Sequence, residues 1–84
     1  MTYEVYLTSE SETFLKKCDK SVRDRIFKKL TSLSNDPEAG KPLTAVLAGL
    51  RSLRIGDYRA IYEIKNSELL ILVIKIGHRK NAYD

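Results

Sequence analysis

The feature that most constrains the fold of this chain is a very short turn between two strand-like segments. Residues 50–55 and 58–64 are rich in apolar and aromatic side chains, and only Gly56 and Asp57 separate them. Glycine at the first position of a two-residue loop is typical of a type II′ turn, which joins two antiparallel strands. The loop length also fixes the register of the two strands. Ile55 pairs with Tyr58, and pairing continues outward from there, one residue at a time on each strand.

The predicted register sorts the side chains of this hairpin onto two faces. Paired residues share a face, so Leu53 and Ala60 extend the apolar face that begins at the turn. Arg54 pairs with Arg59 on the opposite face. Two directly opposed arginines repel each other. We interpret the pair as an anion site, because guanidinium groups match phosphate oxygens.

Two alternatives to an anion site remain open at this stage. Arg54 and Arg59 could be exposed side chains screened by solvent, or they could be bridged by Asp57 or Glu63. Arg51 falls on the other face, at the margin of the apolar surface. The face of Lys75 depends on the length of the turn at residues 65–67, which the sequence does not settle.

The rest of the chain predicts two helices and two further strands. Residues 3–8 alternate as a strand does, and Ser9 with Glu12 resembles a capping box that opens a first helix. A second helix follows from residue 19, with apolar residues at helical spacing and a charged face that we interpret as mainly solvated. Residues 35–49 are irregular. The segment 68–76 is apolar on both faces, as in a strand with neighbours on each side.

This order of elements, β-α-α-β-β-β, predicts an α+β fold. We expect an antiparallel β-sheet with an N-terminal helical hairpin packed on one face. The inward residues of the helices would be Phe14, Leu15, Cys18, Val22, Ile26, Leu30 and Leu33. Residues 1–84 are expected to form a single domain.

Composition excludes several classes of protein. There is one cysteine and one histidine, far apart, so no disulfide and no metal-ligand spacing is expected. Neither a Gly-rich phosphate loop nor a Ser-His-Asp set is present, and we predict no metal and no cofactor. No secretory signal and no apolar run long enough to cross a bilayer is seen, which predicts a cytoplasmic protein without membrane contact. The net charge of +4 fits a nucleic acid or an acidic protein partner, or solubility alone.

The C-terminal segment is short and basic and ends near an aromatic residue. It leaves the last strand, so it could bring Arg79, Tyr83 and His78 to the face of Arg54 and Arg59. A tyrosine ring can stack on a base, which favours RNA over an isolated phosphate as the ligand. The alternative is a frayed tail.

Residues 53–64 (Leu-Arg-Ile-Gly-Asp-Tyr-Arg-Ala-Ile-Tyr-Glu-Ile), followed by an apolar strand, Gly77-His78-Arg79 and a terminal tyrosine, closely resemble the RelE/ParE toxin superfamily. The resemblance covers nearly the whole chain. It implies a RelE-like toxin of a type II toxin–antitoxin system that enters the ribosomal A site and cleaves messenger RNA. Its partners would be the ribosome, the messenger, and a cognate RelB-like antitoxin with an acidic segment.

The resemblance also implies roles for individual residues. Arg54 and Arg59 would clamp a phosphate, Arg79 would stabilise the transition state, and Tyr83 would stack on a base. We predict a metal-independent ribonuclease, in which the RNA 2′-hydroxyl attacks the adjacent phosphate. His78 is the candidate for proton transfer, because arginine is a poor proton carrier. The catalytic set is thus Arg54, Arg59, Arg79 and Tyr83, and the RNA-binding set is Arg51, Ser52, Lys75, His78 and Lys80.

One position departs from the family pattern. Relatives often carry another Arg or Lys two residues before Arg54, where this chain has Ser52. Either a bulge rotates Arg51 onto the active face, or the protein works with one cation fewer. Two other functions stay open: a ParE-like inhibitor of DNA gyrase that acts by binding, and a catalytically weak RNA-binding relative. ParE-like members generally lack the terminal arginine and tyrosine, so Arg79 and Tyr83 favour the RelE-like function.

Overall fold

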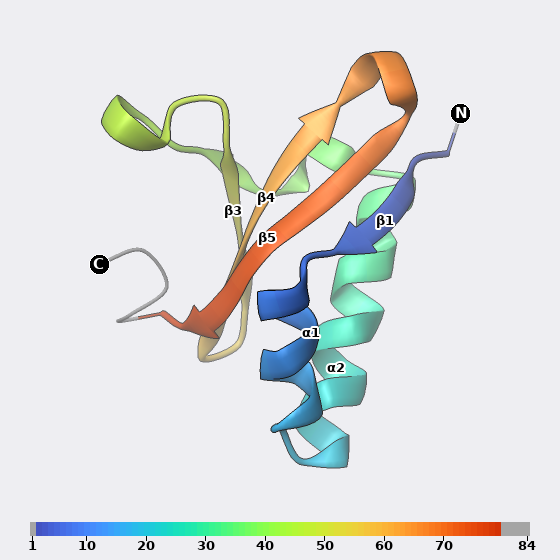
Figure 1. Cartoon of the computed structure of the whole chain (residues 1–84), viewed down its shortest axis with the longest axis vertical. Helices are drawn as coiled ribbons and strands as arrows, with labels where there is room; N and C mark the ends of the chain where they lie inside the picture. The colour runs from blue at the N-terminus through green and yellow to red at the C-terminus, as the bar shows by residue number, and fades with distance from the viewer. Residues whose placement is uncertain (1, 80–84) are drawn as a thin grey trace.

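Two helices lie on one side of a twisted sheet in the computed structural model, which describes residues 2–79 (Figure 1). The helices are α1 (Ser9–Lys16) and α2 (Lys20–Thr31). The strands are β1 (Glu4–Leu7), β2 (Lys41–Pro42), β3 (Arg51–Ile55), β4 (Tyr58–Lys65) and β5 (Leu70–His78). The predicted α+β fold with an N-terminal helical hairpin is confirmed.

The strands follow the order β1-β5-β4-β3-β2 across the sheet. β2, β3, β4 and β5 pair antiparallel in succession, whereas β1 pairs parallel with β5. The sheet is therefore mostly antiparallel rather than wholly so. Turn lengths constrain only neighbouring strands, and β1 reaches β5 from the far end of the chain, so its direction could not be predicted from a turn. The two-residue strand β2 was also missed.

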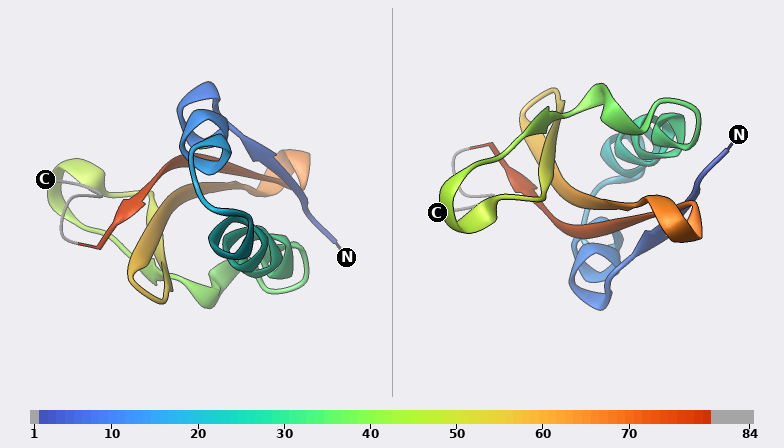
Figure 2. Two further views of the ribbon diagram at one scale, coloured as in Figure 1. Left: turned by 90° about the horizontal axis from the view of Figure 1, so that it is seen from below. Right: turned by 90° about the horizontal axis from the view of Figure 1, so that it is seen from above.

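The core fills the space between the helices and the inner face of the sheet. Figure 2 shows the loop of residues 43–50 on the other side of the strands from α2. The buried core residues are Leu15, Ile26, Leu30 and Leu33 from the helical region and Leu53, Ile55, Ala60, Tyr62, Ile71, Val73 and Ile76 from the strands. Helical spacing predicted the buried residues of the helices, and the hairpin register predicted those of β3 and β4. The inward residues of β5 were not predicted.

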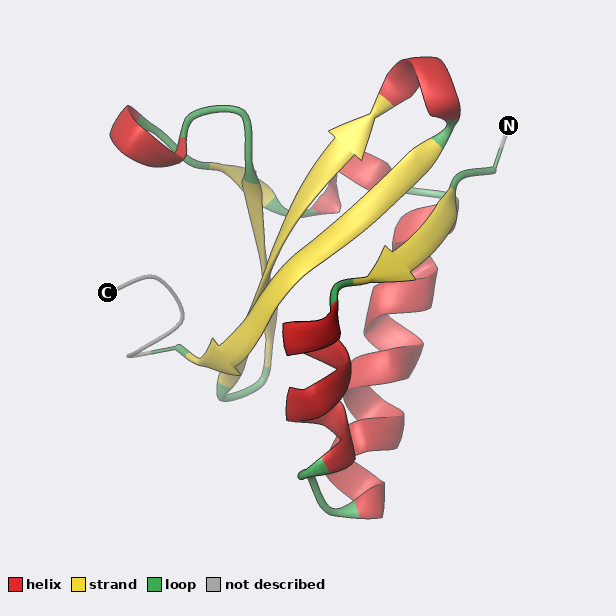
Figure 3. Cartoon of the chain, viewed as in Figure 1, coloured by secondary structure: helices red, strands yellow, loops and turns green. Residues whose placement is uncertain are grey.

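Several element boundaries differ from the sequence prediction, those of α1 and β5 most clearly. α1 is capped by Thr8 rather than Ser9, and the Thr8 hydroxyl oxygen accepts a hydrogen bond from the Ser11 backbone N–H at 3.2 Å. β5 begins after a short 3-10 turn (Asn66–Glu68, red in Figure 3) and continues two residues beyond Ile76. It has neighbours on both sides, as its apolar sequence predicted. No helix within residues 2–79 is long and apolar enough to cross a membrane.

Candidate nucleic-acid interface

The hairpin of β3 and β4 has the predicted register. Ile55 pairs with Tyr58, and Arg54 pairs with Arg59. Gly56 has a positive φ of 59°, as the first loop residue of a type II′ turn requires. The two arginines therefore share the face of the sheet opposite the helices, which we call the outer face. Arg54 is exposed and Arg59 is half-buried.

A β-bulge places Lys75 on the same outer face. Lys65 pairs with Leu70 across a turn of four residues. If this register continued along both strands, Lys75 would pair with Ala60, on the helix side. The register shifts by one residue after Val73, so Lys75 pairs with Ile61 instead. Ile61 shares the outer face with Ser52 and lies two residues from Arg59. The sequence left the face of Lys75 undecided, because nothing in β5 itself signals the bulge.

Two hydroxyl groups at the start of α1 hold the bulge. The Thr8 hydroxyl donates to the carbonyl oxygen of Ile74 at 2.8 Å. The Ser11 hydroxyl donates to the carbonyl oxygen of Val73 at 2.9 Å, and Ser11 is fully buried. The pairing of β1 with β5 ends at Leu7 and Val73. The hydroxyl groups of Thr8 and Ser11 therefore bind β5 where this pairing ends. Sequence reasoning missed both residues, although a buried serine inside an apolar helix face needs a hydrogen-bond partner.

The C-terminal end of β5 places His78 and Arg79 apart, whereas the sequence predicts them together. The Arg79 backbone N–H donates to the Asp57 carbonyl oxygen at 3.0 Å, which holds Arg79 beside the turn between β3 and β4 (Figure 1). His78 instead pairs with Tyr58, and their ring centroids lie 4.8 Å apart. Tyr58 belongs to the helix-side face, where it contacts Phe14. His78 therefore does not join the arginines.

Two other predicted residues, Lys80 and Tyr83, lie outside the described residues. Glu63, offered above as a bridge to the arginines, approaches Lys65 at 3.7 Å instead. Ser52 lies on the outer face and pairs with Ile61 on β4.

Arg51 has a structural role and does not reach the outer face. It pairs with the buried Tyr62, on the helix side of the sheet. Its Nε donates to the Gly40 carbonyl oxygen at 3.0 Å and its Nη2 to the Glu38 carbonyl oxygen at 3.2 Å. The bulge lies in β5 rather than in β3, so nothing rotates Arg51 toward Arg54. This position gives no support to the predicted RNA-binding role of Arg51, which stays a prediction.

Tyr62 also binds the segment of residues 37–40, through its hydroxyl group. Its hydroxyl donates to the Pro37 carbonyl oxygen at 2.6 Å and accepts from the Gly40 N–H at 2.9 Å. Burial raises the pKa of Tyr62, so its phenol keeps the proton that it donates to the Pro37 carbonyl oxygen. A Cβ on Gly40 would lie 2.8 Å from both the Ser52 carbonyl oxygen and the Tyr62 hydroxyl, so only glycine fits there. Residues 37–40 are thereby fixed just before β2.

Two basic hollows meet at the edge of β3. The first, of about 430 Å³, is lined by Lys29, Ala39, Gly40, Lys41, Pro42, Leu43, Ser52, Leu53, Arg54 and Arg59. The second, of about 420 Å³, is lined by Arg25, Lys28, Lys29, Ser32, Arg54, Ile55 and Gly56. They share Lys29 and Arg54, and no acidic residue among residues 2–79 lines either of them. The charged face of α2, which we had interpreted as mainly solvated, thus continues the surface of the arginine pair.

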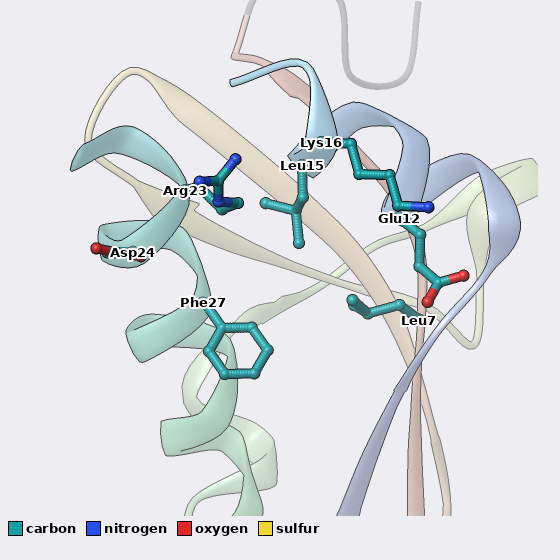
Figure 4. Close-up of a pocket in the computed structure, with 7 residues that line it drawn as sticks. All are labelled: Leu7, Glu12, Leu15, Lys16, Arg23, Asp24 and Phe27. Atoms are coloured by element: carbon teal, nitrogen blue, oxygen red, sulfur yellow. The ribbon is translucent and has the colours of Figure 1, made fainter. Parts of the chain in front are cut away.

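A third hollow, between the helices, has a different character. Figure 4 shows its lining residues, which carry both signs of charge around an apolar floor: Leu7, Glu12, Leu15, Lys16, Arg23, Asp24 and Phe27. The carboxylates of Glu12 and Asp24 disfavour a polyanion there. The surface best suited to a nucleic acid is therefore the outer face with the edge of β3.

Other kinds of site receive little support. Within residues 2–79, no three His, Cys, Asp or Glu side chains gather to hold a metal ion. Cys18 lies at the margin of the core, and its thiol contacts the Phe14 carbonyl oxygen at 3.3 Å. Burial raises the pKa of Cys18, which disfavours the thiolate that a nucleophile needs.

Comparison with known proteins identifies the family. A sequence model described as the ParE toxin of type II toxin–antitoxin systems matches residues 5–83. The chain belongs to the RelE/ParE toxin family. The toxin is 31% identical to toxin RelG of Mycobacterium tuberculosis over 99% of its own length and 98% of that of RelG.

Solved structures agree with this assignment. A chain of the RelBE2 toxin–antitoxin complex of M. tuberculosis matches the toxin with a TM-score of 0.87 and 30% identity, over 94% of the toxin and all of that chain. A chain of the archaeal RelE–RelB complex of Pyrococcus horikoshii matches with a TM-score of 0.77 and 27% identity, over 98% and 100% of the two chains. The toxin is thus a RelE-type member of a type II toxin–antitoxin system.

Proposed function

We propose that this toxin is a ribosome-dependent endoribonuclease that cleaves messenger RNA in the ribosomal A site and acts in the cytoplasm. The observation that carries the proposal is the direct pairing of Arg54 with Arg59 beside a basic hollow whose lining, within residues 2–79, has no acidic residue. Opposed guanidinium groups are stabilised by an anion between them, and RNA supplies a phosphate at every nucleotide. Lys75 adds positive charge on the same face.

The proposed reaction is an internal transfer within the RNA. The 2′-oxygen attacks the adjacent phosphorus, the bond to the 5′-oxygen breaks, and the 5′-oxygen takes up a proton. The products are a 2′,3′-cyclic phosphate and a 5′-hydroxyl. The phosphate gains negative charge on the way, and fixed guanidinium groups stabilise that charge without a metal.

Each residue has a part in this scheme. Arg54 and Arg59 hold the phosphate, and Arg79 stabilises the transition state from the end of β5. The backbone bond from Arg79 to the Asp57 carbonyl oxygen holds Arg79 beside the turn that follows Arg54. Tyr83 stacks on a base. His78 contributes no proton in this scheme, because it lies against Tyr58 on the other face.

The test is in vitro translation with mapping of cuts on the messenger, run beside a DNA supercoiling assay with gyrase. We expect cuts only on programmed ribosomes, with 2′,3′-cyclic phosphate ends, and no cut where the nucleotide at the cleavage site is 2′-deoxy. Supercoiling should be unaffected.

The second candidate function, inhibition of DNA gyrase by binding, is favoured by the ParE description of the matching family. Intact messenger together with blocked supercoiling would establish it and overturn our proposal. A protein inert in both assays would instead be a catalytically weak relative.

We further propose that a cognate RelB-like antitoxin with an acidic segment covers the basic surface. The toxin carries a net charge of +4, and two similar solved structures are complexes with RelB-type antitoxins. Exposed opposite charges attract less strongly as salt rises. We expect the affinity of the two proteins to fall by about tenfold between low and high salt, measured by calorimetry. An affinity independent of salt would rule out electrostatic capture.

A further inference from the structure

Lys41 lies beside the position where this toxin lacks a cation. In the short pairing of β2 with β3, Lys41 is the partner of Ser52. Paired residues share a face, and their Cβ atoms are about 4.5–5.5 Å apart. Lys41 therefore stands on the outer face, one strand away from Ser52. Its side chain is exposed.

The surroundings of Lys41 are strongly basic. The hollow of about 430 Å³ at the edge of β3 is lined by Lys29, Lys41, Arg54 and Arg59, among others. The positive charges of Lys29, Lys41 and Arg54 attract a phosphate into this hollow. The hollow also includes the Ser52 position itself.

The strand that carries Lys41 is held firmly although it is only two residues long. The side chains of Tyr62 and Arg51 form hydrogen bonds with the backbone of residues 37–40, which directly precede this strand. Tyr62 is fully buried, so this anchor belongs to the core. The fold thus fixes the backbone of Lys41 at the rim of the hollow.

We propose that Lys41 binds a phosphate of the RNA and supplies, from the neighbouring strand, the positive charge that Ser52 does not provide. The identity of the anion rests on the function proposed above. Arg51, one residue from Ser52, acts as a positioning residue for this lysine rather than as an RNA ligand.

The experiment compares RNA binding by variants that move or remove one charge. The probe is a short single-stranded RNA with 2′-O-methyl riboses, which the proposed reaction cannot cut. Affinity is measured by fluorescence anisotropy over a salt series. We expect Lys41→Ser to lower the affinity about tenfold at low salt and to reduce the salt slope by about 0.7, as the loss of one single-strand phosphate contact does.

Two matched variants separate a site-specific charge from net charge and from folding. Lys17→Ser removes the same charge from the end of α1, away from both basic hollows, and should change the affinity by less than about twofold. The double variant Lys41→Ser with Ser52→Lys moves the cation across the strand pair at constant net charge. It should recover the wild-type slope and most of the affinity.

Several results would overturn the proposal. Equal behaviour of Lys41→Ser and Lys17→Ser would show that Lys41 has no specific contact, and failure of the double variant to recover would show that the charge is not the cause. Loss of binding to an acidic antitoxin peptide, with RNA binding unchanged, would make Lys41 a protein-binding residue. Wild-type toxin that binds RNA but cuts no messenger would overturn only the cleavage proposal. The comparison of RNA binding by the variants would still decide the role of Lys41.

Discussion

Replacing Arg79 with alanine is expected to lower the rate of messenger cleavage on programmed ribosomes by about 10²–10³-fold, the effect of removing one fixed donor from a developing oxyanion. The backbone bond from Arg79 to the Asp57 carbonyl oxygen does not depend on the side chain, and Arg79 lies beyond the last residue of β5. Stability should therefore change by no more than about 0.5 kcal/mol, as for most surface substitutions. The rate is measured under single-turnover conditions, and stability by urea unfolding.

The adjacent residue provides the control for this experiment. His78→Ala removes a ring contact with Tyr58 on the helix side and should leave the cleavage rate close to that of the wild type. Arg79→Lys keeps the charge but loses the planar fork, and we expect a rate between those of the wild type and the alanine variant. If His78→Ala were as damaging as Arg79→Ala, the proton-transfer role set aside above would have to be restored.

The second large effect is expected at the bulge in β5. Thr8→Val keeps the shape of the side chain but removes the cap of α1 and the bond to the Ile74 carbonyl oxygen. The loss of a cap and of a partly buried hydrogen bond should together cost about 1–3 kcal/mol. For a domain of this size, each 1 kcal/mol lowers the Tm by about 4–8 °C.

The bulge variant should also weaken RNA binding under conditions where it remains folded, because an unsupported bulge lets Lys75 return toward the helix side. Thr31→Val is the matched control. The Thr31 hydroxyl donates to the Lys28 carbonyl oxygen at the exposed end of α2, so its loss should cost less than about 0.5 kcal/mol. Equal stability and equal RNA affinity of the two variants would show that Thr8 does not hold the bulge.

Much of the fold was predictable because it depends on local patterns. Helical spacing identified the inward residues of α2, such as Ile26 and Leu30, and both are fully buried. The cap of α1 was displaced by one residue, since Thr8 and Ser9 are both good caps and only the contact with Ser11 distinguishes them. The parallel pairing of β1 was not predictable, because no turn connects β1 to β5.

The candidate site divides in the same way. The sequence by itself determined that Arg54 and Arg59 stand side by side, since a two-residue turn closes the hairpin between residues only five positions apart. Only the tertiary structure decided the places of Lys75, His78 and Lys41. Lys75 depends on hydroxyl groups more than 60 positions away in the chain. The position of Lys41 depends on the buried Tyr62, which forms hydrogen bonds with the residues just before it. A short turn restricts the backbone directly, whereas these contacts exist only after the helices and the sheet have packed together.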